Sequence, residues 1–153
     1  MSIITTAAAH AINDCRARDA PCCSRDAHCC SRDTIDTAMQ VYEWDRIPKE
    51  QLSPVFARQV IHSDTMTVAR VYLKQGCAVP EHSHHNEQIS MVEQGALKFV
   101  MGGVERVLRA GEVLRIPANV PHSAEAMEDS VAMDLFAPPR EDWIRGDDGY
   151  LRR

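Results

Sequence analysis

The sequence has few cationic residues and no cluster of them. Its 153 residues carry 17 Lys and Arg against 22 Asp and Glu, which gives a formal net charge of −5. A nucleic-acid partner would require clustered Lys and Arg that displace counterions from phosphates. The charge distribution therefore argues against nucleic-acid binding.

Long apolar runs and a secretory signal are also lacking. The apolar runs are interrupted by charged residues or glycine well before the roughly 20 residues that a membrane-spanning helix needs. Residues 3–9 are apolar or small, but no basic residue precedes them, and a charged, cysteine-rich stretch follows them. A secretory signal instead has a basic stretch, followed by an apolar stretch and a cleavage site of small residues. We therefore expect no membrane insertion and a cytoplasmic location.

Cysteines are rare outside one stretch, because five of the six lie between residues 15 and 30. A disulfide-stapled domain would spread them along the fold. This stretch repeats with a period of seven residues and has no apolar face, so it cannot fold by burying surface. A zinc knuckle needs gaps between its cysteines, whereas two pairs here are adjacent. We predict that residues 1–38 form a disordered leader and that Met39 is a candidate start of the natural protein.

Helix signals are scarce from Met39 onward, where short apolar stretches alternate with turns rich in Gly, Asp and Pro. Helical turns are expected only near residues 48–52 and near Asp142. Short, regularly spaced strands are typical of a β-sandwich or barrel, so residues 39–153 are predicted to form one all-β domain. The predicted strands are residues 55–61, 66–73, 88–92, 97–101, 104–108, 113–116, 122–126 and 131–136.

His82 and His84 are separated by one residue in a segment that is predicted to be extended. Alternate side chains of an extended backbone share a face, so both imidazoles are directed the same way. Gln88 falls on that face if the strand continues, whereas His85 and Glu87 fall on the other. Alternation therefore selects Gln88, rather than Glu87, as the oxygen donor beside the two histidines.

His122 supplies a third imidazole from a later part of the chain. Single histidines usually belong to the polar surface or to a satisfied core, but packing gives no reason to concentrate three of them. Three imidazoles and one amide oxygen suit a divalent first-row metal and leave room for water or substrate. We predict a metal site made of His82, His84, Gln88 and His122, with a ligand set that suits nickel, zinc, manganese and iron alike.

The spacing of these residues resembles the two motifs of the cupin family. The resemblance covers residues 40–140, and it implies a jelly-roll barrel (a double-stranded β-helix) of six to eight antiparallel strands with the metal in its mouth. Gln88 stands where the first motif usually has Glu, and Asn119 stands where the second usually has Gly. The motifs read Gly76, five residues, His82-x-His84, three residues, Gln88, six residues, Gly95; and Gly111, five residues, Pro117-x-Asn119, two residues, His122.

The C-terminal part resembles one subgroup more closely, the KdgF-type cupins of pectin and alginate uronate degradation. The stretch 133–143 has Asp134 and Arg140, six residues apart, where that subgroup has an Asp and an Arg that serve the chemistry. The resemblance implies opening of a 4,5-unsaturated monouronate to its linear keto form. Asp134 would transfer protons and Arg140 would grip the carboxylate. Phe136 shares the strand face of Asp134 and is expected to line the pocket.

Other functions remain open at this point. Asp134 alternates with apolar neighbours and could face solvent, and Arg140 could anchor the C-terminal tail through an ion pair. The same three-histidine frame also serves dioxygenases, lyases of small organic acids and ligand-binding cupins without activity. We expect a metal-dependent isomerase or tautomerase that acts on a small sugar acid. Small cupins resemble one another in pairing barrels through sheet edges, which implies a homodimer.

Overall fold

This computed structural model describes residues 39–152 of the chain. Ten antiparallel strands make up most of this part. The all-β jelly-roll prediction is confirmed. The strands are β1 (Glu50–Ser53), β2 (Phe56–His62), β3 (Thr67–Leu73), β4 (Ala78–His82), β5 (Glu87–Gln94), β6 (Ala96–Met101), β7 (Val104–Arg109), β8 (Val113–Ile116), β9 (His122–Ala126) and β10 (Ser130–Ala137). The predicted leader, residues 1–38, lies outside the described residues.

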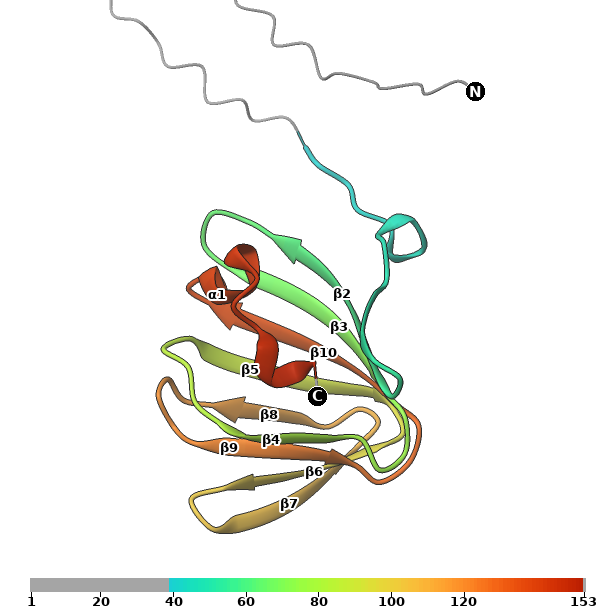
Figure 1. Ribbon diagram of the computed structural model, residues 1–153, viewed down its shortest axis with the longest axis vertical. Coiled ribbons are helices and arrows are strands. Elements are labelled where there is room, and N and C mark those ends of the chain that lie inside the picture. The colour runs from blue at the N-terminus through green and yellow to red at the C-terminus, as the bar shows by residue number, and fades with distance from the viewer. Residues whose placement is uncertain (1–38, 153) are drawn as a thin grey trace, which may run out of the picture. The chain divides into compact units, whose positions relative to one another are not determined.

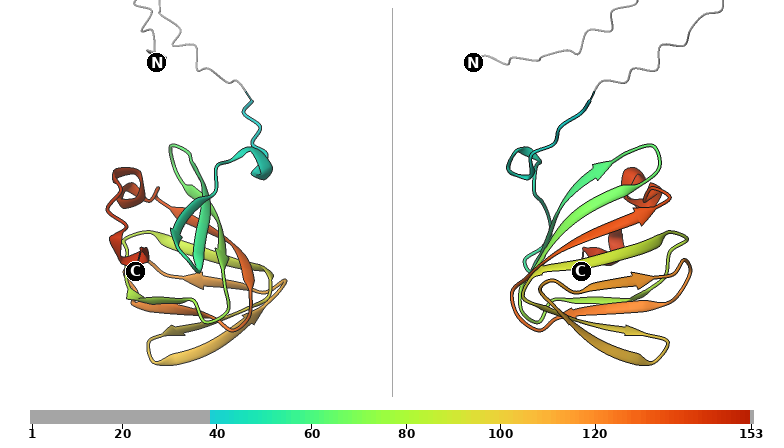
Figure 2. Two further views of the ribbon diagram at one scale, coloured as in Figure 1. Left: turned by 45° about the vertical axis from the view of Figure 1, so that its right-hand side comes forward. Right: turned by 180° about the vertical axis from the view of Figure 1, so that it is seen from behind.

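The strands form two sheets that make up the walls of a barrel (Figures 1 and 2). One sheet has the order β1-β2-β3-β10-β5-β8, and the other has the order β4-β9-β6-β7. The chain crosses from one sheet to the other between β3 and β4, β4 and β5, β5 and β6, β7 and β8, β8 and β9, and β9 and β10. These crossings bring segments distant in sequence together, so that β10 pairs with both β3 and β5.

Strand alternation decides which side chains enter the barrel. Buried and half-buried residues alternate along the whole of β3, and the same alternation runs through β10 as far as Phe136. Ala69, Val71 and Ala132 occupy interior positions of these strands and contribute to the apolar core. Asp134 occupies an interior position of the same series, so a carboxylate enters the barrel among apolar side chains.

The structure has two more strands than the six to eight expected, and both lie at sheet edges. Residues 48–52 were expected to form a helical turn, but β1 forms there because Glu50 and Gln51 pair with β2. β4 is not among the predicted strand ranges, although the segment with His82 and His84 was expected to be extended, because Pro80 interrupts its apolar pattern. A proline is tolerated at this position since β4 is an edge strand, where one backbone donor is not needed.

The helices are short. The turn predicted near Asp142 is confirmed as α1 (Glu141–Arg145), which ends at Gly146 in the left-handed conformation. Two 3-10 turns, η1 (Trp44–Arg46) and η2 (Gly149–Leu151), flank the barrel strands in the sequence. Within residues 39–152, no helix has the length and apolar character required to cross a bilayer.

Candidate metal centre

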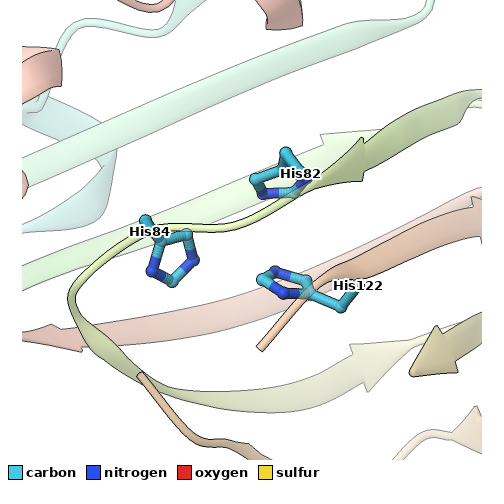
Figure 3. Close-up of side chains that lie close together, drawn as sticks. All are labelled: His82, His84 and His122. Atoms are coloured by element: carbon cyan, nitrogen blue, oxygen red, sulfur yellow. The ribbon is translucent and has the colours of Figure 1, made fainter. Parts of the chain in front are cut away.

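Three histidines meet at one end of the barrel. The available nitrogen atoms of His82, His84 and His122 all lie within 4.8 Å of one another. His82 ends β4 and His122 begins β9, and the two residues are partners in the strand register. His84 reaches the same point from the loop between β4 and β5. Figure 3 shows the three imidazoles turned toward one another, so the structure brings the three predicted histidines together.

All three imidazoles are oriented in the same way by the backbone. In each ring, Nδ1 lies within hydrogen-bonding distance of a carbonyl oxygen two residues away along the chain. A carbonyl oxygen only accepts, so Nδ1 carries the proton and Nε2 presents a lone pair. This arrangement is typical of histidines that bind a metal through Nε2. The distances are 2.9 Å from His82 to Pro80, 3.0 Å from His84 to Asn86 and 2.8 Å from His122 to Val120.

Gln88 lies against this cluster. Its Oε1 is 3.2 Å from Nε2 of His84. Because the proton of the His84 ring is on Nδ1, its Nε2 and the Oε1 of Gln88 are both hydrogen-bond acceptors. Two acceptors this close repel each other unless they share a cation. The side chain of Gln88 also acts to lower the pKa of Asp134, which is the effect of an amide NH2 near a carboxylate, while its Oε1 faces His84. The donor set therefore fits a divalent metal held by three nitrogens and one oxygen.

Gln88 reaches the cluster by a different route from the one predicted. The strand does not continue from His84, because β4 ends at His82 and β5 begins at Glu87. Asn86, in the intervening loop, is fully buried and donates from Nδ2 to the carbonyl oxygen of Pro138, 2.6 Å away. The chain thus crosses to the other sheet, and Gln88 enters the barrel as an interior residue of β5.

Burial keeps the three imidazoles neutral. Desolvation lowers the pKa of His82 and of His84 to about 4, and it lowers the pKa of His122 as well. The positive charge of Arg140 acts in the same direction on all three. Neutral imidazole is the form that binds a metal, so the rings are ready for binding at neutral pH.

Asp134 points into the barrel and does not face solvent. Its Oδ1 accepts a hydrogen bond of 2.6 Å from Oγ of Ser90, its partner in the register of β5 and β10. Desolvation raises the pKa of Asp134 to about 6, although hydrogen bonds from Ser90 and Gln88 and the charge of Arg140 oppose the shift. A carboxyl group with this pKa can both release and accept a proton near neutral pH.

Arg140 lies at the same end of the barrel, with 1 % of its surface exposed. Its Nε and Nη2 donate to the two oxygens of Asp142 at 2.9 and 2.6 Å, and Nη2 also donates to the hydroxyl of Tyr150 at 2.7 Å. The guanidinium lies over the rings of Phe136 and Trp143, 4.9 and 4.3 Å from their centres. The side chain is therefore paired within the chain, at a distance from solvent.

Residues 69–137 match the family model described as "Cupin domain". This match agrees with the two-sheet barrel, and the chain has the cupin fold. Asn119, the departure from the second cupin motif, has φ 63° and donates from its backbone nitrogen to the carbonyl oxygen of His84 at 2.7 Å. Asn tolerates the left-handed conformation better than most residues, which explains how it replaces the glycine of that motif.

Several known proteins are similar to this chain. The structure of KdgF from Halomonas sp. is 29% identical and superimposes with a TM-score of 0.65, covering 68% of this chain and 99% of that one. An RmlC-like cupin from Shewanella frigidimarina NCIMB 400 is 24% identical, with a TM-score of 0.65 over 69% of this chain and 96% of that one, and supports the fold. Acireductone dioxygenase 1 of Pectobacterium atrosepticum is 34% identical over 70 residues, 42% of this chain. The chain spans about two fifths of that relative's length.

A small cavity of about 60 Å³ adjoins the candidate metal-ligand cluster. Phe136, predicted to line the pocket, is one of its walls. Ser90 was missed, although alternation from Gln88 could have placed it inside. Tyr150 was also missed, because no motif or periodicity connects it with the histidines; its ring centre lies 5.0 Å from that of His82. The lining also includes Gln88, His82, His122, Asp134, Arg140, Trp143 and Leu151.

Proposed function

We propose that the protein is a metal-dependent isomerase or tautomerase that opens an unsaturated uronate or a related small sugar acid. The observation that carries the proposal is the buried Asp134, whose pKa is raised to about 6 beside Gln88 of the metal-ligand cluster. A structural role alone gives no reason to bury this carboxyl group. The similarity to KdgF over nearly all of that protein's length supports the same reaction class.

The residues of the chain can be given roles in such a reaction. When bound by His82, His84, His122 and Gln88, a divalent metal would stabilise negative charge that develops on substrate oxygens. Asp134 takes the proton of the anomeric hydroxyl as the ring C–O bond breaks and a carbonyl forms. It then delivers this proton to the former alkene carbon, so that the product is an isomer of the substrate.

Arg140 is proposed to hold the substrate carboxylate. A guanidinium group binds a carboxylate in a bidentate geometry, as it already does with Asp142. The substrate would therefore compete with Asp142, or use the remaining nitrogen, Nη1. Among residues 39–152, no hydrogen bond involves Nη1 of Arg140.

The direct test follows the absorbance of the unsaturated-uronate chromophore. Metal-loaded protein is expected to remove the chromophore rapidly, whereas metal-stripped protein and the Asp134→Asn variant are expected to be inactive. Isomerisation consumes no oxygen. Unchanged absorbance with fully loaded wild-type protein would overturn the proposed substrate class.

A dioxygenase is the second candidate, favoured by the 34% identity to acireductone dioxygenase 1 over 70 residues. This reaction would need the same open metal site, loaded with iron, and would consume oxygen. An oxygen electrode distinguishes the two candidates when iron-loaded protein is given small organic acids. Oxygen uptake that depends on His84 would favour the dioxygenase.

A further inference from the structure

The cavity beside the metal-ligand cluster is too small for the substrate class proposed above. Its volume of about 60 Å³ corresponds to roughly two water molecules. Pockets that bind small organic ligands usually measure roughly 300 Å³ or more. A sugar acid can therefore occupy this cavity only if one of its walls moves.

Only one wall of the cavity lies outside the strand ladders. Most lining residues belong to β2–β6, β9 and β10, whose backbones are fixed by hydrogen bonds to neighbouring strands. The exceptions beyond β10 include Trp143, Tyr150 and Leu151, which belong to the C-terminal segment 141–152. Figure 1 shows this segment in red, as a short helix and a turn that belong to neither sheet.

The inner contacts of the segment reach the candidate site. Tyr150 lies with its ring centre 5.0 Å from that of His82 and accepts a hydrogen bond from Nη2 of Arg140 at 2.7 Å. Trp143 packs edge-on against Phe136, with 5.0 Å between the ring centres. The segment therefore touches one metal-ligand residue and both predicted pocket residues, Arg140 and Phe136.

The outer end of the segment is held by four charged side chains, which we call the latch: Glu50, Arg58, Asp148 and Arg152. Asp148 is fully buried and accepts hydrogen bonds from Arg58 and from Nε of Arg152, the latter at 2.9 Å. Nε of Arg58 also donates to Glu50 at 2.9 Å, and Arg152 pairs with the other oxygen of Glu50. The latch thus joins the segment to β1 and β2 by polar contacts, which water can replace when they open.

The closed arrangement leaves two buried donors without partners among the described residues. Nε1 of Trp143 and Nη1 of Arg58 have no hydrogen-bond acceptor. Both lie where the segment meets the barrel, since the guanidinium of Arg58 lies 4.4 Å from the ring centre of Trp143. Unsatisfied buried donors disfavour the closed state, and opening would expose them to water. Gly146, with φ 79°, lies between α1 and the latch and provides a hinge without steric strain.

We propose that residues 141–152 form a lid that opens to admit substrate, and that Tyr150 is a positioning residue which holds Arg140 when the lid is closed. The identity of the substrate rests on the proposed function, but the opening of the lid does not. Loss of the latch increases opening. Loss of the Tyr150 hydroxyl releases Arg140 while the ring stays in place.

Hydrogen exchange on the metal-free full-length protein tests the lid without an activity measurement. In Glu50→Gln, the amides of residues 141–152 are expected to exchange about tenfold faster, with unchanged rates in β5 and β10. Raising the ionic strength from about 0.05 M to about 0.5 M should accelerate their exchange in the wild type and less in the variant, because salt screens the half-exposed pairs. Glu125→Gln is the matched control, since it removes a similar surface ion pair with Lys98 on the other sheet.

Equal acceleration in every strand, or none in residues 141–152, would overturn the lid. Tyr150→Phe tests the positioning role: KM for the unsaturated uronate should rise while kcat stays within about threefold, because the carboxylate contact is weakened and the proton transfer is not. A fall in kcat with unchanged KM would overturn that role. If the wild type has no uronate activity, only the proposed function fails, since the exchange measurement is independent of turnover.

Discussion

Ser90 and Asp134 are joined by a 2.6 Å hydrogen bond across the paired strands β5 and β10. The hydroxyl donates to a carboxyl group that is 9 % exposed and whose pKa burial raises from 3.8 to about 6. Ionisation of Asp134 at neutral pH is therefore opposed by its surroundings. A buried carboxyl group whose ionisation is opposed by its surroundings destabilises the fold at neutral pH. Such groups are typical of functional sites.

Asp134→Asn is expected to stabilise the metal-free protein at neutral pH. Well below pH 3.8 the carboxyl group is protonated in both folded and unfolded chains. Between pH 4 and 6 the unfolded chain loses the proton and the folded chain retains it, so wild-type stability falls as the pH rises. Above pH 6 the advantage of the Asn variant should reach up to about 3 kcal/mol, to be measured by urea unfolding from pH 4 to 8.

Asp129→Asn is the control with the opposite sign. Hydrogen bonds from Lys74 and from the backbone of Gln75 lower the pKa of Asp129. This variant should therefore be less stable than wild type above pH 4, and the difference should disappear in acid. A pH-independent effect of Asp134→Asn would contradict the burial argument.

Gln88→Glu tests why the first cupin motif has an amide here. The amide side chain of Gln88 lowers the pKa of Asp134, and a second carboxylate would replace this effect by that of a negative charge. In the metal-free protein the pKa of Asp134 should rise further, as measured by carbon NMR of its carboxyl group. Metal affinity should increase roughly tenfold or more, because a charged oxygen binds a divalent cation more strongly than a neutral one.

Gln94→Glu is the matched control, at the exposed end of the same strand. It adds the same charge far from Asp134, and it should change neither the pKa of Asp134 nor the metal affinity. An unaltered pKa for Asp134 in Gln88→Glu would mean that the two side chains do not interact.

His84→Ala and its neighbour His85→Ala form a second pair of test variants. His84 contributes Nε2 to the cluster, whereas His85 is exposed on the other side of the chain. Zinc or nickel at about a hundredfold excess over its Kd should stabilise the wild type and His85→Ala by about 2.7 kcal/mol. Thermal unfolding at matched metal concentration should show most of this gain lost in His84→Ala; equal gains in all three proteins would exclude His84 as a ligand.

Local pattern was sufficient to predict most of the barrel. Eight strands were predicted close to their observed positions, because alternating apolar residues between turns specify both a strand and its buried face. β1 and β4 escaped this reasoning, since edge strands bury few side chains and their pairing depends on distant partners. Pro80 in β4 is acceptable only because of its place in the sheet, which the sequence of β4 itself does not contain.

The candidate site was predicted less completely than the fold. The histidines could be found from spacing, but the burial of Asp134 depends on its register with Ser90 in another strand. The pairing of Arg140 with Asp142 was within reach of local sequence, whereas the contact with Tyr150 depends on how the C-terminal segment returns to the barrel. Contacts of this kind are set by tertiary packing and leave no periodic signal.

Gly95→Ala is expected to be far more harmful than Gly76→Ala, although both glycines have φ 78°. A Cβ at Gly95 would lie 2.5 Å from the carbonyl oxygen of Asp129 and 2.9 Å from Cα of Ser130, whereas a Cβ at Gly76 would meet no atom within 4 Å. Gly76→Ala should therefore show only the conformational strain of about 1–2 kcal/mol. Gly95→Ala adds overpacking at the start of β10, for a total of roughly 2–4 kcal/mol in urea unfolding. Since β10 carries Asp134, this variant should also shift the pKa of that carboxyl group, while equal losses of stability in the two variants would contradict the steric argument.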